Sequence, residues 1–169
     1  MKRLEKVTKR LSHESQTPND SQTLTRLELP LDDAIMFDLL KWAIQKQSLE
    51  VIASLIEQGI DVNAKSDHCG LTALHYAAMG NSLEIVQLLV SKGADIQARD
   101  KSGKIPLHRA AGAWSCIDVF RYLVSQSVDI FAQDKSGRTP YGYALDNMPE
   151  KQRILCEKMA DLYPLPQES

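Results

Sequence analysis

Residues 70–100 read GLTALHYAAMGNSLEIVQLLVSKGADIQARD, and this stretch decides the fold. Its second half contains apolar residues at helical spacing, which predicts a helix that buries one apolar stripe: Leu83, Val86, Leu89 and Val90. We expect this helix to end at Gly93, because glycine readily adopts the left-handed conformation that closes many helices. The polar run that follows predicts a projecting, hairpin-like loop.

The same pattern recurs at a fixed distance along the chain. The segment at 82–100, which contains the predicted helix and the start of the loop, aligns without a gap with two others. The three sequences are SLEVIASLIEQGIDVNAKS at 48–66, SLEIVQLLVSKGADIQARD at 82–100 and CIDVFRYLVSQSVDIFAQD at 116–134. One repeat position therefore holds three aspartates: Asp61, Asp95 and Asp129. The segment that begins at Gly70 recurs as well: GLTALHYAA from Gly70, GKIPLHRAA from Gly103 and GRTPYGYAL from Gly137. A unit of about 33 or 34 residues is one supersecondary element that needs its neighbours to bury its apolar side.

A second, shorter helix is expected after each loop. In the last unit Thr139 precedes Pro140, so the hydroxyl can cap free amides while proline occupies the first turn. In the second unit Ala77 and Ala78 are small enough to let neighbouring helices approach closely. One unit thus reads as helix, loop, helix and projecting turn.

With these motifs the chain resembles the ankyrin repeat family, whose pattern is G-x-T-P-L-H-x-A-A, a second helix and then G-A-D. The resemblance covers roughly residues 32–163 and implies an all-α solenoid of about four stacked helix-turn-helix units joined by hairpin-like loops. Tetratricopeptide repeats share the period, but they do not place G-A-D and a glycine-containing polar turn between helix pairs. The predicted divisions are a basic arm at 1–29 and a repeat domain at 30–169, with units at about 32–66, 67–99, 100–133 and 134–163.

Some positions depart from the family pattern. Ala73 replaces proline and Ile105 replaces threonine, so these two helix starts lose a preset φ or a cap. In the first unit Asp32 or Asp33 can instead begin a longer helix, which suits a terminal repeat. The third unit has one extra residue between its helices, which leaves Trp114 in a connection.

Composition and charge narrow the class of protein. The formal net charge of −2 and the pI near 6.1 exclude a basic surface over the whole molecule. Cys69, Cys116 and Cys156 are odd in number and widely separated, which argues against a disulfide scaffold and a zinc site. The first thirty residues lack the apolar core of a signal peptide, and no apolar run of about twenty residues follows. We therefore expect a cytoplasmic protein.

Candidate catalytic or metal-binding residues are few. His75 and His108 hold the histidine position of the family motif, so we expect structural hydrogen bonds from both. His68 and Cys69 could bind a metal or supply a nucleophile, but no further ligand or base lies at a recognisable spacing from them. No phosphate-binding loop, nucleophile elbow or HExxH motif is present. The sequence thus predicts no enzyme, no cofactor and no metal.

The resemblance instead implies binding through the hairpin tips and the inner face of the short helices, which together are expected to form an extended concave surface. Aromatic and arginine side chains dominate such interfaces. The candidate partner-binding residues are Trp42, His68, Leu71, Tyr76, Met79, Lys101, Lys104, Arg109, Trp114, Lys135, Arg138 and Tyr143. Two successive tips are basic, so the expected partner is another protein with an acidic extended segment or loop, bound by a monomer.

Two alternatives remain open from the sequence, and a third is disfavoured. The chain could be a bacterial effector or adaptor that acts on host proteins. The basic arm MKRLEKVTKRL could instead associate with an anionic membrane or with nucleic acid. An F-box-like adaptor beginning at LELPLDD is disfavoured, because the span before the first repeat is too short for three helices.

Overall fold

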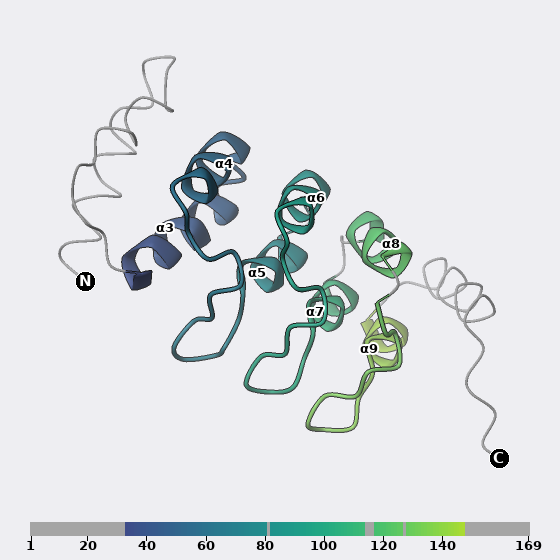
Figure 1. The fold of residues 1–169 in the computed structure, drawn as a ribbon. Coiled ribbons are helices and arrows are strands. Elements are labelled where there is room, and N and C mark those ends of the chain that lie inside the picture. Colours follow the sequence, from purple (N-terminus) through teal and green to yellow (C-terminus); the bar gives the residue numbers. More distant parts are fainter. Residues whose placement is uncertain (1–32, 81, 114–116, 127, 148–169) are drawn as a thin grey trace.

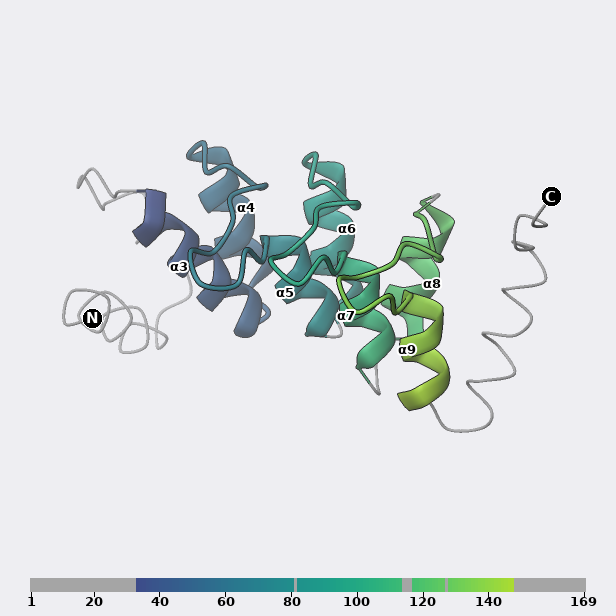
Figure 2. The ribbon, with the colours of Figure 1, turned by 90° about the horizontal axis from the view of Figure 1, so that it is seen from below.

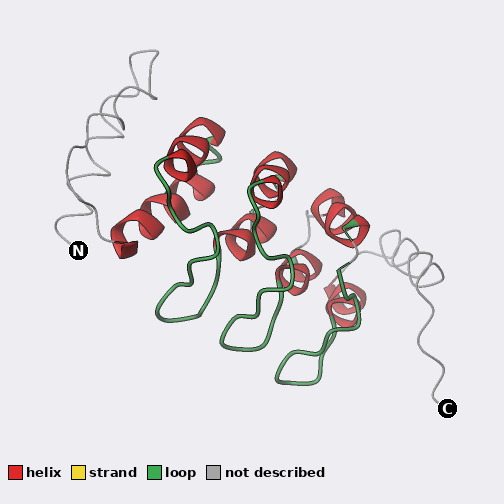
Figure 3. Ribbon diagram, in the orientation of Figure 1, coloured by secondary structure: helices red, strands yellow, loops and turns green. Residues whose placement is uncertain are grey.

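The computed structural model describes residues 33–80, 82–113, 117–126 and 128–147. The basic arm, Trp114 and the predicted second helix of the last unit lie outside this part of the chain. Its helices are α3 (Asp33–Gln45), α4 (Leu49–Glu57), α5 (Ala73–Met79), α6 (Leu83–Ser91), α7 (Pro106–Gly112), α8 (Ile117–Ser125) and α9 (Pro140–Asn147). Within the described ranges no strand occurs, and the predicted all-α fold class is confirmed (Figure 3).

The helices stack in two parallel rows. One row contains α3, α5, α7 and α9, and the other contains α4, α6 and α8, as Figures 1 and 2 show. Each helix of the first row packs against the next, and α3, α5 and α7 each also contact the helix that follows in the sequence. Three loops project side by side next to the first row (Figure 1). The predicted solenoid of helix pairs and hairpin-like loops is therefore present.

The core lies between the two rows, where the apolar stripe of each helix meets its neighbours. Val86 and Leu89 of the stripe predicted for α6 are fully buried, together with Ile85. On α5 the side chains of Ala77 and Ala78 have no exposed surface, so the helices of the first row pack closely. Since every apolar face is shared with an adjacent unit, no single unit could exclude water alone.

The ends of the helices follow the sequence signals. Gly93 has a φ of 87°, in the left-handed region expected there, and Gly59 holds the same place after α4 with a φ of 90°. At the start of α9 the hydroxyl of Thr139 accepts a hydrogen bond from the N–H of Gly142 at 3.1 Å, which confirms the predicted cap. Of the helices that the structure describes, α3 comes first; it is 13 residues long and begins at Asp33, as predicted for the terminal repeat.

Substituting Ala73→Pro is expected to stabilise the protein by about 0.5 kcal/mol, because proline restricts the unfolded chain at a position that tolerates it. Ala73 is the first residue of α5, and Thr72 before it is already extended, with φ −89° and ψ 169°. Pro106 holds the same position in α7 and is buried there. Urea unfolding is the measurement. Pro106→Ala should lose a similar amount, and an Ala73→Pro protein less stable than the parent would contradict the argument.

Candidate functional site

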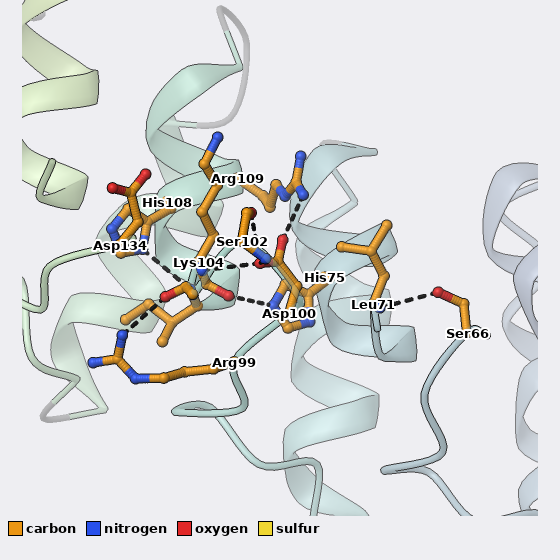
Figure 4. Close-up of polar contacts among 12 residues, drawn as sticks. Ser66, Leu71, His75, Arg99, Asp100, Ser102, Lys104, His108, Arg109 and Asp134 are labelled. Atoms are coloured by element: carbon orange, nitrogen blue, oxygen red, sulfur yellow. Dashed lines mark hydrogen bonds and ion pairs between the residues drawn. The ribbon is translucent and has the colours of Figure 1, made fainter. Parts of the chain in front are cut away.

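The second hairpin, residues 99–105, is closed by the carboxylate of Asp100. One oxygen, Oδ1, accepts hydrogen bonds from the backbone N–H and hydroxyl of Ser102, at 2.8 and 2.7 Å, and from the N–H of Lys104 at 2.9 Å (Figure 4). In the third hairpin, residues 133–139, Asp134 accepts from the N–H groups of Ser136 and Arg138 in the same way. Neither aspartate was predicted as a site residue, although both hairpins contain the identical sequence DKSG.

The second carboxylate oxygen fixes each hairpin to the short helix that follows. Arg109 on α7 donates to Oδ2 of Asp100 at 2.5 Å, and the hydroxyl of Tyr143 on α9 donates to Oδ2 of Asp134 at 2.9 Å. Burial raises the pKa of the Asp100 carboxyl, but the hydrogen bonds from Ser102 and Arg109 outweigh it and hold the pKa below its ordinary value. Both buried aspartates are thus bound as carboxylates, and Arg109 and Tyr143 have a structural role.

Two buried histidines connect each repeat to the next. Just before α5 the N–H of Thr72 donates to Nδ1 of His75 at 3.2 Å, which leaves the proton on Nε2. Nε2 then donates to the carbonyl of Lys104 at 3.0 Å (Figure 4). His108 bridges the N–H of Ile105 and the carbonyl of Arg138 in the same manner, at 3.1 Å each. The structural role predicted for both histidines is confirmed.

Neighbouring hairpins also contact one another directly. The N–H of Lys101 donates to the carbonyl of Cys69 at 2.9 Å, and the N–H of Lys135 donates to the carbonyl of Ser102 at 3.0 Å. A Cβ at Gly103 would lie 3.0 Å from the N of Lys135, so the close approach requires glycine there. The hairpins are therefore held at a fixed spacing by main-chain hydrogen bonds.

Several cations on the hairpins bind neutral carbonyl groups. Lys65 Nζ donates to the carbonyl of Arg99 at 3.2 Å, and Arg99 donates to the carbonyls of Gly103 and Gln133 at 2.9 and 2.8 Å. Lys101 Nζ donates to the carbonyl of Asp67. A carbonyl oxygen carries no net charge, so these contacts brace the hairpins without neutralising the cations.

Charge is divided between two sets of aligned segments in the described repeats. We define the hairpin row as residues 65–76, 99–109 and 133–143, and the outer row as residues 49–61, 83–95 and 117–129. The hairpin row has seven Lys or Arg residues and three Asp, two of which, Asp100 and Asp134, are buried. The outer row has seven Asp or Glu residues and two Lys or Arg. The net charge of the chain, −2, therefore does not reveal that the hairpin row is basic.

Two cations meet at the ring of Tyr143 in the hairpin row. Lys104 Nζ lies 4.8 Å from the ring centroid and the guanidinium carbon of Arg138 lies 4.2 Å from it. His108 packs against the same ring, with the two ring centroids 5.8 Å apart. We call Lys104, Arg138 and Tyr143 the Tyr143 cluster.

A comparison with family models finds a match described as ankyrin repeats (3 copies) over residues 40–134. The chain belongs to the ankyrin repeat family. No curated protein matches the chain. Ankyrin repeats generally act as protein–protein interaction modules and are typically non-catalytic. The ankyrin framework of this chain therefore presents the hairpin row as its candidate binding surface.

Most of the predicted binding residues lie at the surface of the ankyrin repeats. Exposed side chains are those of His68, Met79, Lys101, Lys135 and Arg138, and half-buried ones are those of Trp42, Tyr76, Lys104, Arg109 and Tyr143. Leu71 is a correction: only 7% of it is exposed, because it follows Gly70 into the base of the first hairpin, where its N–H donates to Ser66 Oγ at 3.0 Å. Trp114 lies outside the described residues.

The first hairpin differs from the other two ankyrin hairpins in its chemistry. Ser66 takes the position of the buried aspartates, and Tyr76 takes the position of Arg109 and Tyr143. Tyr76 packs against Phe37, with ring centroids 6.3 Å apart, and Lys41 lies 5.9 Å from its centroid but is also paired with Asp38 at 3.3 Å. The first hairpin thus lacks the aspartate that closes the second and third hairpins.

The described part of the ankyrin repeats contains neither a cluster of metal ligands nor a membrane-spanning helix. Among the residues that the structure describes, no three potential ligands of His, Cys, Asp or Glu lie close enough together to hold a metal ion. None of the helices in these ranges is long and apolar enough to cross a membrane. Cys69 is a free, exposed thiol on the first hairpin.

Proposed function

We propose that these ankyrin repeats bind an acidic, extended segment of another protein along the hairpin row. The division of charge carries this proposal, because the surface of the hairpin row is basic while the outer row and the whole chain are acidic. An acidic segment gains favourable electrostatic energy on the hairpin row and meets like charge on the outer row, so the charge pattern selects one side. The repeats then act as a recognition module without catalytic chemistry.

Rigidity of the hairpin row supports the same function. The main-chain hydrogen bonds between hairpins and the bridges from His75 and His108 fix the loops before any partner arrives. A preorganised surface loses little conformational entropy when it binds an extended segment. The cations at the tips, Lys101, Lys135 and Arg138, are therefore displayed at a set spacing.

Reversing the charge of Lys101, Lys135 and Arg138 to Glu is expected to weaken binding of an acidic probe at least about tenfold, because three exposed attractions become repulsions. The probe is a fluorescein-labelled ten-residue peptide of alternating Glu and Ser, and its Gln and Ser analogue is the neutral control. Fluorescence anisotropy at low ionic strength measures the affinity, and thermal unfolding confirms that the variant folds.

A matched variant carries the same number of reversals elsewhere. Lys46, Lys92 and Arg121 are exposed and lie outside the hairpin row, so their reversal to Glu should leave the affinity for the probe within about threefold of the parent. If the two triple variants lose the same affinity, only the net charge matters. That result would reject the proposed use of the hairpin row.

A further inference from the structure

Lys101 and Lys135, which we call the tip lysines, lie in the same way against the hairpin that precedes each of them. A Cβ at Gly70 would lie 3.1 Å from Cγ of Lys101. A Cβ at Gly103 would likewise lie 3.2 Å from Cγ of Lys135. Each lysine side chain therefore begins by crossing the glycine of the preceding hairpin, in space that a larger residue would fill. The two side chains leave the hairpins in the same direction.

The charges of the tip lysines are not balanced within the described part of the chain. Both side chains are exposed, and no carboxylate of the described residues forms an ion pair with either ammonium group. Lys101 Nζ contacts the carbonyl of Asp67, which carries no net charge. The Tyr143 cluster, by contrast, adjoins the carboxylate of Asp134, which Tyr143 contacts. An anionic partner can thus approach both tip lysines from solvent without displacing a carboxylate.

The distance between the tip lysines is set by the stacking of the repeats. The N–H of Lys135 donates to the carbonyl of Ser102 at 3.0 Å, and Ser102 directly follows Lys101. Covalent geometry then keeps the Cα atoms of Lys101 and Lys135 within about 11 Å of each other. Helices α5, α7 and α9 pack side by side, which places neighbouring repeats about 8 to 10 Å apart. The two charges are therefore offset by one repeat along the row of hairpins (Figure 1).

Resting on the proposed function, we propose that the tip lysines select the acidic segment by the spacing of its carboxylates. The bound segment carries acidic residues three positions apart and lies across the hairpins in the polyproline II conformation. In that conformation the third residue returns to the same side of the chain after about 9 Å, which matches one repeat. In a β-strand the residues on one face recur after about 7 Å, so neighbouring carboxylates do not match the two lysines.

Two fluorescein-labelled peptides of identical composition test this inference. EPSEPSEPSE has Glu at every third position, and EPESEPESPS has Glu at every second position over most of its length. The first peptide is expected to bind the full chain at least about fivefold more tightly, because two lysines then engage two carboxylates at once. Fluorescence anisotropy in one buffer of low ionic strength measures both affinities. Equal affinities, or tighter binding of the second peptide, would overturn the inference.

Single variants assign the preference to the tip lysines. Lys135→Gln should bring the two affinities within about twofold of each other, since the one remaining tip lysine cannot distinguish the spacing of two carboxylates. Lys92→Gln removes the same charge from the exposed surface of the outer row and should leave the preference unchanged. Thermal unfolding checks that both variants are folded. A preference that persists in Lys135→Gln would overturn the assignment.

The failure of this inference and the failure of the proposed function give different results. If the inference alone is wrong, both Glu peptides bind the parent equally, and each binds more tightly than its analogue with Gln in place of Glu. If the proposed function is wrong, neither Glu peptide binds more tightly than its Gln analogue.

Discussion

Replacing Asp100 with alanine is expected to lower the free energy of unfolding by about 3 kcal/mol, since removing one partner of a buried charged network leaves the others unsatisfied. The side chain of Asp100 is 1% exposed and accepts four hydrogen bonds, two of them from backbone N–H groups in the second hairpin. Without the carboxylate those groups lose their acceptor, and the partly buried charge of Arg109 loses its counter-ion. Urea unfolding monitored by circular dichroism measures the change.

The first hairpin supplies a matched control for this prediction. Ser66 and Tyr76 occupy there the positions of Asp100 and Arg109, and a serine hydroxyl accepts the turn N–H. The double variant Asp100→Ser with Arg109→Tyr should therefore be more stable than Asp100→Ala, because it supplies an acceptor and removes the unpaired cation together. A loss below about 1 kcal/mol for Asp100→Ala would show that the carboxylate network contributes no more than an ordinary hydrogen bond.

Acidification below pH 6.5 is expected to destabilise the protein through His75 and His108. Burial lowers the pKa of both imidazoles below the ordinary 6.5, and the hydrogen bonds to the carbonyls of Lys104 and Arg138 offset this only in part. The unfolded chain therefore takes up protons first as the pH falls. The contribution of the neutral histidines to the free energy of unfolding is complete above about pH 6.5. As the pH falls from there to the lowered pKa, each histidine loses at most about 1.4 kcal/mol of this contribution per pH unit.

Glutamine substitutions isolate the two histidines in this pH dependence. Gln at the third position of a helix can still accept the N–H at the helix start, but it does not titrate. The double variant His75→Gln with His108→Gln should be less stable at pH 7 and should change little in stability between pH 7 and 5. His68→Gln, on the exposed first hairpin, should keep the pH dependence of the parent. If the stability of the double variant falls with pH as steeply as that of the parent, titration of other groups causes the pH dependence.

Much of the fold could be predicted because it depends on short, repeated signals. Gly93 closes α6 and Thr139 caps α9, and both were expected from residues within one turn of the position concerned. The equivalence of Asp61, Asp95 and Asp129 also holds, since each accepts a hydrogen bond from the N–H two residues later, at 2.8 to 2.9 Å. Local conformational preference and a fixed period were sufficient for these features.

The candidate site was harder to predict because its contacts join residues in different elements. Arg109 and Tyr143 were expected to contact a partner, but each also binds an aspartate nine residues earlier. This contact depends on how the hairpin folds back onto the helix, which the sequence pattern does not indicate. Leu71 was placed at a tip because it stands beside exposed residues, yet the turn at Gly70 carries it inward. The basic tips were predicted from the aligned repeats, whereas the acidic character of the outer row was not, although it is present in the same alignment.

The separation of the hairpin row from the outer row gives the described repeats an electric dipole across their width. An approaching acidic molecule is turned toward the hairpins while it is still several ångströms from contact, so added salt should slow its arrival more than it hastens its departure. The same asymmetry has a consequence at the bench. At neutral pH and low salt, cation-exchange and anion-exchange resins should each retain the protein, by opposite sides.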